Sequence, residues 1–126
     1  MGHSYRDLQV WKKSMQLAVS IYGLSKEFPR EELYGLTSQI RRSAVSIPSN
    51  IAEGHGRQNT GEFKYFLGIA RGSNYELQTQ LELARSLELE NPVQIGKASE
   101  LSDEVGKMIY GLLETLHNHC QLKTEN

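Results

Sequence analysis

The sequence lacks the cysteine pairs whose disulfides stabilise small secreted domains, and it has no apolar segment long enough to cross a membrane. Its 126 residues include one cysteine, Cys120, so no disulfide can form within the chain. No apolar run approaches the roughly 18 residues of a membrane span. Residues 1–8 also lack the apolar stretch of a signal peptide. We therefore expect a cytoplasmic protein that folds as a single domain over residues 1–126.

The chain has no large excess of charge of either sign, because its formal net charge is only −1. This excludes a generally basic protein that coats polyanions, but the charges are segregated along the chain. Residues 39–72 carry five basic and two acidic side chains, a net charge of +3. Residues 76–104 carry two basic and seven acidic side chains, a net charge of −5. The first segment is therefore where an anionic partner is to be sought.

Alternation with a period of two, which would indicate strands, is absent, and apolar residues recur instead at steps of three and four. The spacing predicts helices over about residues 8–28, 31–53, 60–89 and 92–119. Together they predict an all-α fold, an antiparallel up-down-up-down four-helix bundle. The first helix is apolar over a wide arc because two stripes run side by side along it. These stripes are Leu8, Trp11, Met15, Ala18 and Tyr22, and Leu17, Ile21, Leu24 and Phe28.

Several helix ends are predicted by local signals. Pro29 should end the first helix, because the residue before a proline resists the α conformation. Glu31 and Glu32 should start the second helix, since their charges suit the positive end of its dipole. Asn91 followed by Pro92 predicts the start of the last helix, because proline is well tolerated at the first helical position.

Pro48 lies inside the predicted second helix, where it removes one backbone hydrogen bond. We expect a kink there rather than a break. The polar side chains of Ser46 and Asn50 could satisfy the carbonyl of Ala44, which the proline leaves unpaired.

A glycine-rich connection is predicted over residues 54–58, because glycine and its neighbours there tolerate positive φ. Asn59 and Glu62 then have the spacing of a capping box, in which the first side chain accepts a backbone N–H and the second reaches back. This pair predicts the start of the third helix.

Two glycines of the third helix predict a contact between subunits. Gly68 and Gly72 point away from the core stripe, and each costs about 1 kcal/mol relative to alanine. Glycines four residues apart let another backbone approach closely, and Tyr65 and Ile69 lie beside them. We predict an oligomer interface at these four residues. The alternative is that the glycines accommodate a loop or a bulky side chain of the same chain.

Groups that would carry catalysis are sparse. Glu114 and His117 have the spacing of one metal-binding pair, but a di-iron bundle needs two such pairs and two further glutamates. His117, His119 and Cys120 do not converge on one helix face, which argues against zinc. The glycines after the second helix complete neither a phosphate-binding loop nor a dinucleotide fingerprint. We expect no catalytic residue, metal or cofactor, and interpret His55 as an ordinary loop histidine.

Five basic residues are the candidate nucleic-acid-binding residues. Arg42 projects opposite the core stripe of the second helix, Arg41 lies at its flank, and Arg57 lies in the connection. Lys64 and Arg71, seven residues apart, share one side of the third helix. Antiparallel packing would bring several of these cations into one region suited to phosphate contacts. From the charges alone, solvation or ion pairing with acidic neighbours is the favoured interpretation.

The same region resembles a known family over residues 5–87. The matching motifs are YRDL at 5–8, VW at 10–11, QIRRSA at 39–44, SIP at 46–48, NIAEG at 50–54 and ARGS at 70–73, with Leu36, Arg57, Phe63, Phe66, Leu67, Glu76 and Leu77. They look like the four helix bundle protein family, also called the ribosomal RNA intervening-sequence protein family. The resemblance implies an antiparallel bundle that assembles as a homopentamer and binds nucleic acid through basic surfaces. In retroelement relatives it implies a reverse transcriptase partner, and it supplies no catalytic residue.

The leading hypothesis is therefore a non-enzymatic homo-oligomer, a pentamer by resemblance, whose arginine-bearing surface contacts RNA or DNA. The acidic second half of the chain opposes that interaction. The alternative is a protein–protein scaffold or accessory subunit whose arginines pair across subunits and make no contact with nucleic acid. A metal-dependent enzyme is a third class, but it would need ligands that the sequence does not supply.

Overall fold

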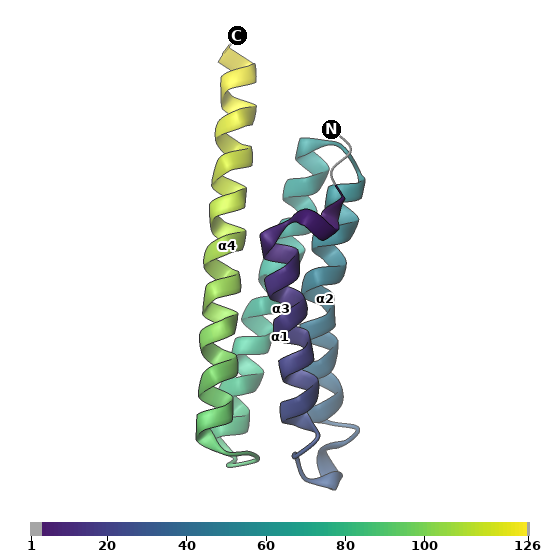
Figure 1. Cartoon of the computed structure of the whole chain (residues 1–126), viewed down its shortest axis with the longest axis vertical. Helices are drawn as coiled ribbons and strands as arrows, with labels where there is room; N and C mark the ends of the chain where they lie inside the picture. The colour runs from purple at the N-terminus through teal and green to yellow at the C-terminus, as the bar shows by residue number, and fades with distance from the viewer. Residues whose placement is uncertain (1–3, 126) are drawn as a thin grey trace.

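A computed structural model describes residues 4–125, with side chains as far as residue 118. It consists of α1 (Gln9–Ser25), α2 (Leu36–Gly56), α3 (Thr60–Ser86) and α4 (Pro92–Glu125), with short 3-10 helices η1 (Tyr5–Asp7) and η2 (Arg30–Glu32). Successive helices run in opposite directions, and the C-terminal part of α4 extends beyond the ends of its neighbours (Figure 1). No strand occurs among the described residues. The predicted all-α four-helix bundle is confirmed.

Each helix packs against two neighbours, so that the four enclose one core. The packed pairs are α1 with α2, α2 with α3, α3 with α4 and α4 with α1, and the α2–α3 pair is the most extensive. The diagonal pairs, α1 with α3 and α2 with α4, make no such contact along the described helices. The core consists of aliphatic side chains from all four helices. The largest of those that are fully buried are Leu17, Ile21, Ile40, Ile47, Ile51, Leu67, Leu77, Leu81, Ile95, Val105 and Ile109.

One of the two apolar stripes of α1 faces this core fully, and the other faces it only in part, through Leu8, Trp11 and Ala18. Leu17, Ile21 and Leu24 are buried, whereas Met15 and Tyr22 of the other stripe are exposed. A helix can turn only part of its circumference inward, so the wide apolar arc of α1 leaves large side chains on the surface of the bundle.

The start of α2 differs from the prediction. Glu31 and Glu32 form the 3-10 helix η2, and α2 begins at Leu36. Gly35 is its N-cap, with a backbone that is neither helical nor extended (φ −113°, ψ −112°). The carboxylate of Glu32 accepts a hydrogen bond from the N–H of Leu36 at 3.3 Å. The acidic charge therefore does favour the helix N-terminus, but it acts from the turn that precedes the helix.

Other helix ends shift by a few residues. α1 ends at Ser25 and α3 at Ser86, three residues before their predicted ends, while α4 runs on to Glu125 rather than 119. The predicted connection at 54–58 is shorter, because α2 continues to Gly56. Among the described residues other than glycine, those with positive φ are Gln58 and Glu88, both at 55°, where the chain leaves α2 and α3.

The caps of α3 and α4 follow the sequence signals. The side chain of Asn59 accepts the N–H of Glu62 at 3.0 Å, which is the first half of the predicted capping box. The carboxylate of Glu62 lies instead 3.6 Å from the guanidinium of Arg57. The side chain of Asn91 accepts the N–H of Val93 at 2.8 Å, as expected for a cap before Pro92.

Pro48 does not break α2, which is continuous through it. The amide of Asn50 donates to the carbonyl of Ser46 at 2.8 Å and to its hydroxyl at 3.0 Å. The expectation that these side chains satisfy the carbonyl of Ala44 is therefore wrong. The hydroxyl of Ser73 on α3 donates to that of Ser46 at 2.8 Å, so this polar group links α2 to α3.

Gly54 allows α2 and α3 to approach each other closely. A Cβ atom added there would lie 2.7 Å from Cβ of Phe66 and 3.1 Å from Cδ1 of Phe63. Real Cβ atoms do not approach a neighbour at 2.7 Å, so a side chain would force the two helices apart. This glycine therefore serves helix packing rather than a loop conformation.

We predict that Gly54→Ala lowers the free energy of unfolding by about 1–3 kcal/mol, because overpacking outweighs the better helix propensity of alanine. Gly23→Ala on α1 is the matched control, since a Cβ there meets nothing within 4 Å. It should leave stability unchanged or raise it by up to about 1 kcal/mol. Urea denaturation at one fixed protein concentration measures both. Equal stability of the two variants would contradict the assignment.

Candidate assembly and nucleic-acid surfaces

The exposed stripe of α1 forms one wall of an apolar groove. We name it the α1–α2 groove, with a volume of about 470 Å³ and a lining of Tyr5, Trp11, Met15, Ala18, Val19, Tyr22, Val45, Pro48, Ser49 and Ala52. Val45, Pro48 and Ala52 share one face of α2 by their spacing of three and four. Val19 is 69% exposed at the rim. A contiguous exposed apolar surface is where a contact with another molecule is to be sought.

The predicted interface on α3 lies on the surface. Tyr65 and Ile69 are exposed, and the added Cβ atoms of Gly68 and Gly72 would meet nothing within 4 Å. The alternative, in which these glycines accommodate a side chain of the same chain, is wrong for the described residues. We call these four residues the α3 outer face.

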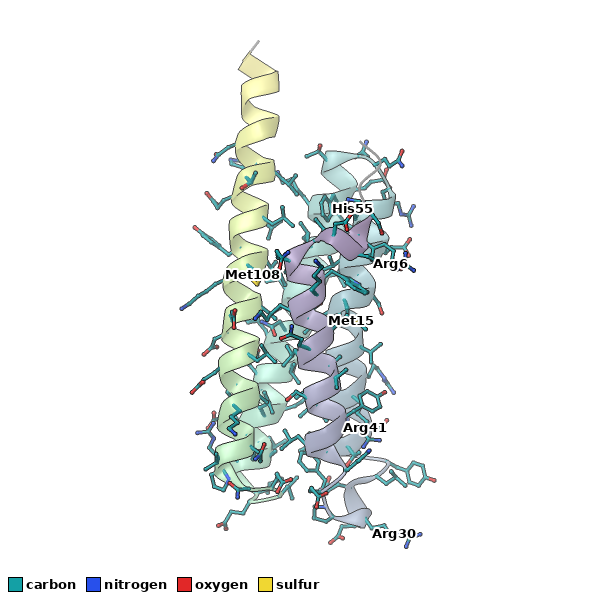
Figure 2. The ribbon with its side chains drawn as sticks, viewed as in Figure 1. Arg6, Met15, Arg30, Arg41, His55 and Met108 are labelled. Atoms are coloured by element: carbon teal, nitrogen blue, oxygen red, sulfur yellow. The ribbon has the colours of Figure 1, made fainter. Side chains whose placement is uncertain are left out.

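Arg41 and Arg42 lie near the turn between α1 and α2. Nε of Arg41 donates to the hydroxyl of Ser25 at 2.7 Å, and its guanidinium lies 4.8 Å from the ring centroid of Tyr22. Arg42 is exposed and makes no ion pair with any described residue. Figure 2 shows Arg30 and Arg41 toward one end of the bundle, with Arg6 and His55 toward the other.

Arg57 lies at that opposite end, because α2 carries the chain about 24 Å between residues 41 and 57. Its guanidinium is 2.8 Å from the carboxylate of Glu53 and 3.6 Å from that of Glu62. It also lies 5.0 Å from the ring centroid of Phe66. Arg57 is thus paired within its own chain, and its charge is largely offset.

Arg71 faces a third region, between α3 and α4. It lines a hollow with Tyr75, Lys107 and Tyr110, and Lys64 lies two turns before it on the same side of α3. Antiparallel packing does not gather several of these cations in one region as expected, since the five occupy three places. The reason is that the side chain of Arg41 contacts α1, whereas Arg71 lies on the side of α3 that is next to α4.

Sequence reasoning missed two cations beside Arg41. Lys26 and Arg30 line a hollow with Arg41, and Tyr34 lines the adjoining one with Arg41 and Arg42. We call this region the α1–α2 end. The turn that Pro29 predicts could have indicated it, because a tight connection brings residues on either side of it together. Counting charges along the sequence did not reveal these two cations, because Glu27, Glu31 and Glu32 lie between and beside them.

The groups considered for catalysis remain apart. Along the described residues, no three His, Cys, Asp or Glu side chains lie close enough together to hold a metal ion. Glu114 and His117 are exposed near the end of α4. The side chains of His119 and Cys120 lie outside the described residues. The ring of His55 packs edge-on against Phe63, with centroids 5.7 Å apart.

Comparison with known proteins agrees with this architecture. Residues 6–111 match the family model of the 23S rRNA-intervening sequence proteins. The chain belongs to that family. The match reaches most of α4, whereas the sequence resemblance ended at residue 87. No curated protein matches this chain. None of its described helices is long and apolar enough to span a membrane.

A solved structure is also similar to this family member. It is a protein of unknown function from the S23 ribosomal protein family of Bacteroides thetaiotaomicron. The two chains are 30% identical, with a TM-score of 0.77, over 83% of this chain and 95% of the other. The relationship therefore extends over nearly the whole bundle.

Proposed function

We propose that this protein is a non-enzymatic, cytoplasmic bundle that assembles into a homo-oligomer and contacts RNA or DNA through its arginine-bearing surface. The α1–α2 groove is the observation that supports assembly most strongly. Met15, Val19, Tyr22 and Val45 remain exposed in one contiguous apolar surface after the core is filled. Covering that surface would gain roughly 25 cal/mol for every Å² removed from water.

The second half of the contact is the α3 outer face. Because α1 and α3 are diagonal in the bundle, the groove and this face lie on different sides of one protomer. Two different surfaces that bind each other join copies head to tail and close into a ring when the rotation fits. The family resemblance puts the number of copies at five. Gly68 and Gly72 would let the neighbouring subunit approach the α3 backbone closely.

We predict that Val19→Glu dissociates the oligomer. A carboxylate buried in an apolar contact without a partner is unfavourable, so the association constant should fall by a factor of about ten or more. Val93→Glu is the matched control, because Val93 is 61% exposed on the first turn of α4, away from both surfaces. Size-exclusion chromatography with light scattering reports the mass of each variant. If both variants assemble like the wild type, the groove is not the interface.

The α1–α2 end is the proposed contact with phosphate. The four cations of this region, Lys26, Arg30, Arg41 and Arg42, exceed by one the three glutamates of the same turn, Glu27, Glu31 and Glu32. A ring repeats this charge around its axis and so enlarges the field that an anionic polymer meets. Arginines that contact phosphate give affinity without reading base sequence.

We predict that Arg41→Ala with Arg42→Ala weakens oligonucleotide binding and flattens its salt dependence. The slope of log K against log salt should become shallower by about 0.7–0.9 for each phosphate contact that is lost. Arg57→Ala is the control, and it should change the slope little because Arg57 is already paired with Glu53 and Glu62. Fluorescence anisotropy from 50 to 200 mM salt, roughly the range in which such contacts dominate, measures this.

A second candidate is a scaffold or accessory subunit without direct nucleic-acid contact. The intrachain pairing of Arg57 and the small charge excess at the α1–α2 end favour it. A reverse transcriptase is the partner that the family resemblance suggests. If the wild type binds no oligonucleotide, or if Arg41→Ala with Arg42→Ala dissolves the oligomer, this candidate replaces nucleic-acid binding.

A further inference from the structure

A hollow between α3 and α4 combines aromatic and basic side chains from both helices. We name it the α3–α4 hollow, lined by Arg71, Asn74, Tyr75, Gln78, Asp103, Gly106, Lys107 and Tyr110. Each wall contributes one tyrosine and one cation: Tyr75 and Arg71 from α3, and Tyr110 and Lys107 from α4. Tyr75 is 54% and Tyr110 57% exposed, so both rings are accessible to a ligand.

The floor of the hollow is held rigidly by hydrogen bonds. The amide of Asn74, which is 1% exposed, donates to the carbonyl of Ser102 at 3.1 Å and accepts from its hydroxyl at 2.8 Å. A Cβ atom at Gly106 would lie 3.1 Å from Nδ2 of Asn74. Glycine at 106 therefore leaves room for the asparagine and adds no side chain to the floor.

Side chains on the walls are also positioned before any ligand arrives. Nε of Arg71 donates to the hydroxyl of Tyr75 at 3.3 Å, and its guanidinium lies 5.8 Å from the centre of that ring. The amide of Gln78 donates to the carboxylate of Asp103 at 3.3 Å. The single acid of the hollow is thus engaged, while two cations face solvent.

This arrangement fits a flat aromatic group attached to phosphates. Bases of single-stranded nucleic acid stack on exposed aromatic side chains, and flanking cations hold the backbone. A paired base inside a duplex cannot enter such a hollow, because its faces are already stacked. The carboxylate of Asp103 can in addition accept a hydrogen bond from an exocyclic amino group.

We propose that the α3–α4 hollow binds an unstacked base of single-stranded RNA or DNA, with the neighbouring phosphates at Arg71 and Lys107. This rests on the proposed nucleic-acid function but concerns a different surface from the α1–α2 end. The hollow then makes the protein selective for single strands, which phosphate contacts alone would not do.

The test is fluorescence anisotropy of the full-length protein with a labelled single-stranded oligonucleotide and a duplex of the same length. Tyr75→Ala and Tyr110→Ala should each weaken single-strand binding about fivefold or more. Tyr110→Phe keeps the ring and should bind nearly as the wild type does. Leu83→Ala is the control, since Leu83 is an exposed side chain of α3 outside the hollow. Lys107→Ala should lower the salt slope by about 0.7, while the tyrosine variants leave it unchanged.

The outcomes separate this proposal from the proposed function. Single-strand binding within twofold of wild type in both tyrosine-to-alanine variants overturns the base site, and so does equally tight duplex binding. If affinity then falls only with Arg41→Ala and Arg42→Ala, nucleic-acid binding at the α1–α2 end stands without the hollow. If the wild type binds no oligonucleotide, both proposals are refuted. Circular dichroism melts that match the wild type exclude a folding defect in each variant.

Discussion

The width of the apolar arc on α1 constrains the rest of the structure. An amphipathic helix can bury only one side in a bundle, and α1 buries the side that carries Leu17 and Ile21. Packing the other stripe inward would expose these aliphatic side chains instead. Met15, Val19 and Tyr22 therefore stay outside, against Val45 and Pro48 of α2. The groove is therefore formed by residues of the bundle itself and of the short helix η1. The proposed assembly depends on this groove.

Charge is distributed so that no single basic patch forms. Arg57 is neutralised by two glutamates, and Lys13 of α1 pairs with Glu104 of α4 at 3.1 Å. Lys26, Arg30 and Arg42 are exposed at the α1–α2 end and Arg71 and Lys107 in the α3–α4 hollow, whereas the exposed Arg6, Lys12 and Lys97 lie outside both. Both places also hold tyrosines, Tyr34 at the first and Tyr75 and Tyr110 at the second. Each of these surfaces therefore combines exposed tyrosines with cations.

The fold could be predicted because each of its determinants is local. Apolar spacing of three and four identified four helices, and Asn59 and Asn91 mark two helix starts with caps that the structure contains. The start of α2 was missed because Glu32 acts from the turn that precedes the helix. The distribution of the cations was missed for another reason: which neighbour a side chain faces depends on helix rotation in the bundle. For the same reason, no signal along the chain predicts that Tyr75 and Tyr110 line the same hollow.

The central claim is that a protomer with a filled core still carries apolar surface that recruits further copies. Light scattering of the unmodified protein over a dilution series tests it most directly. The account predicts a molar mass that is a multiple of the 14.3 kDa of one chain, falling toward that value only at high dilution. A mass of one chain at every concentration would contradict it.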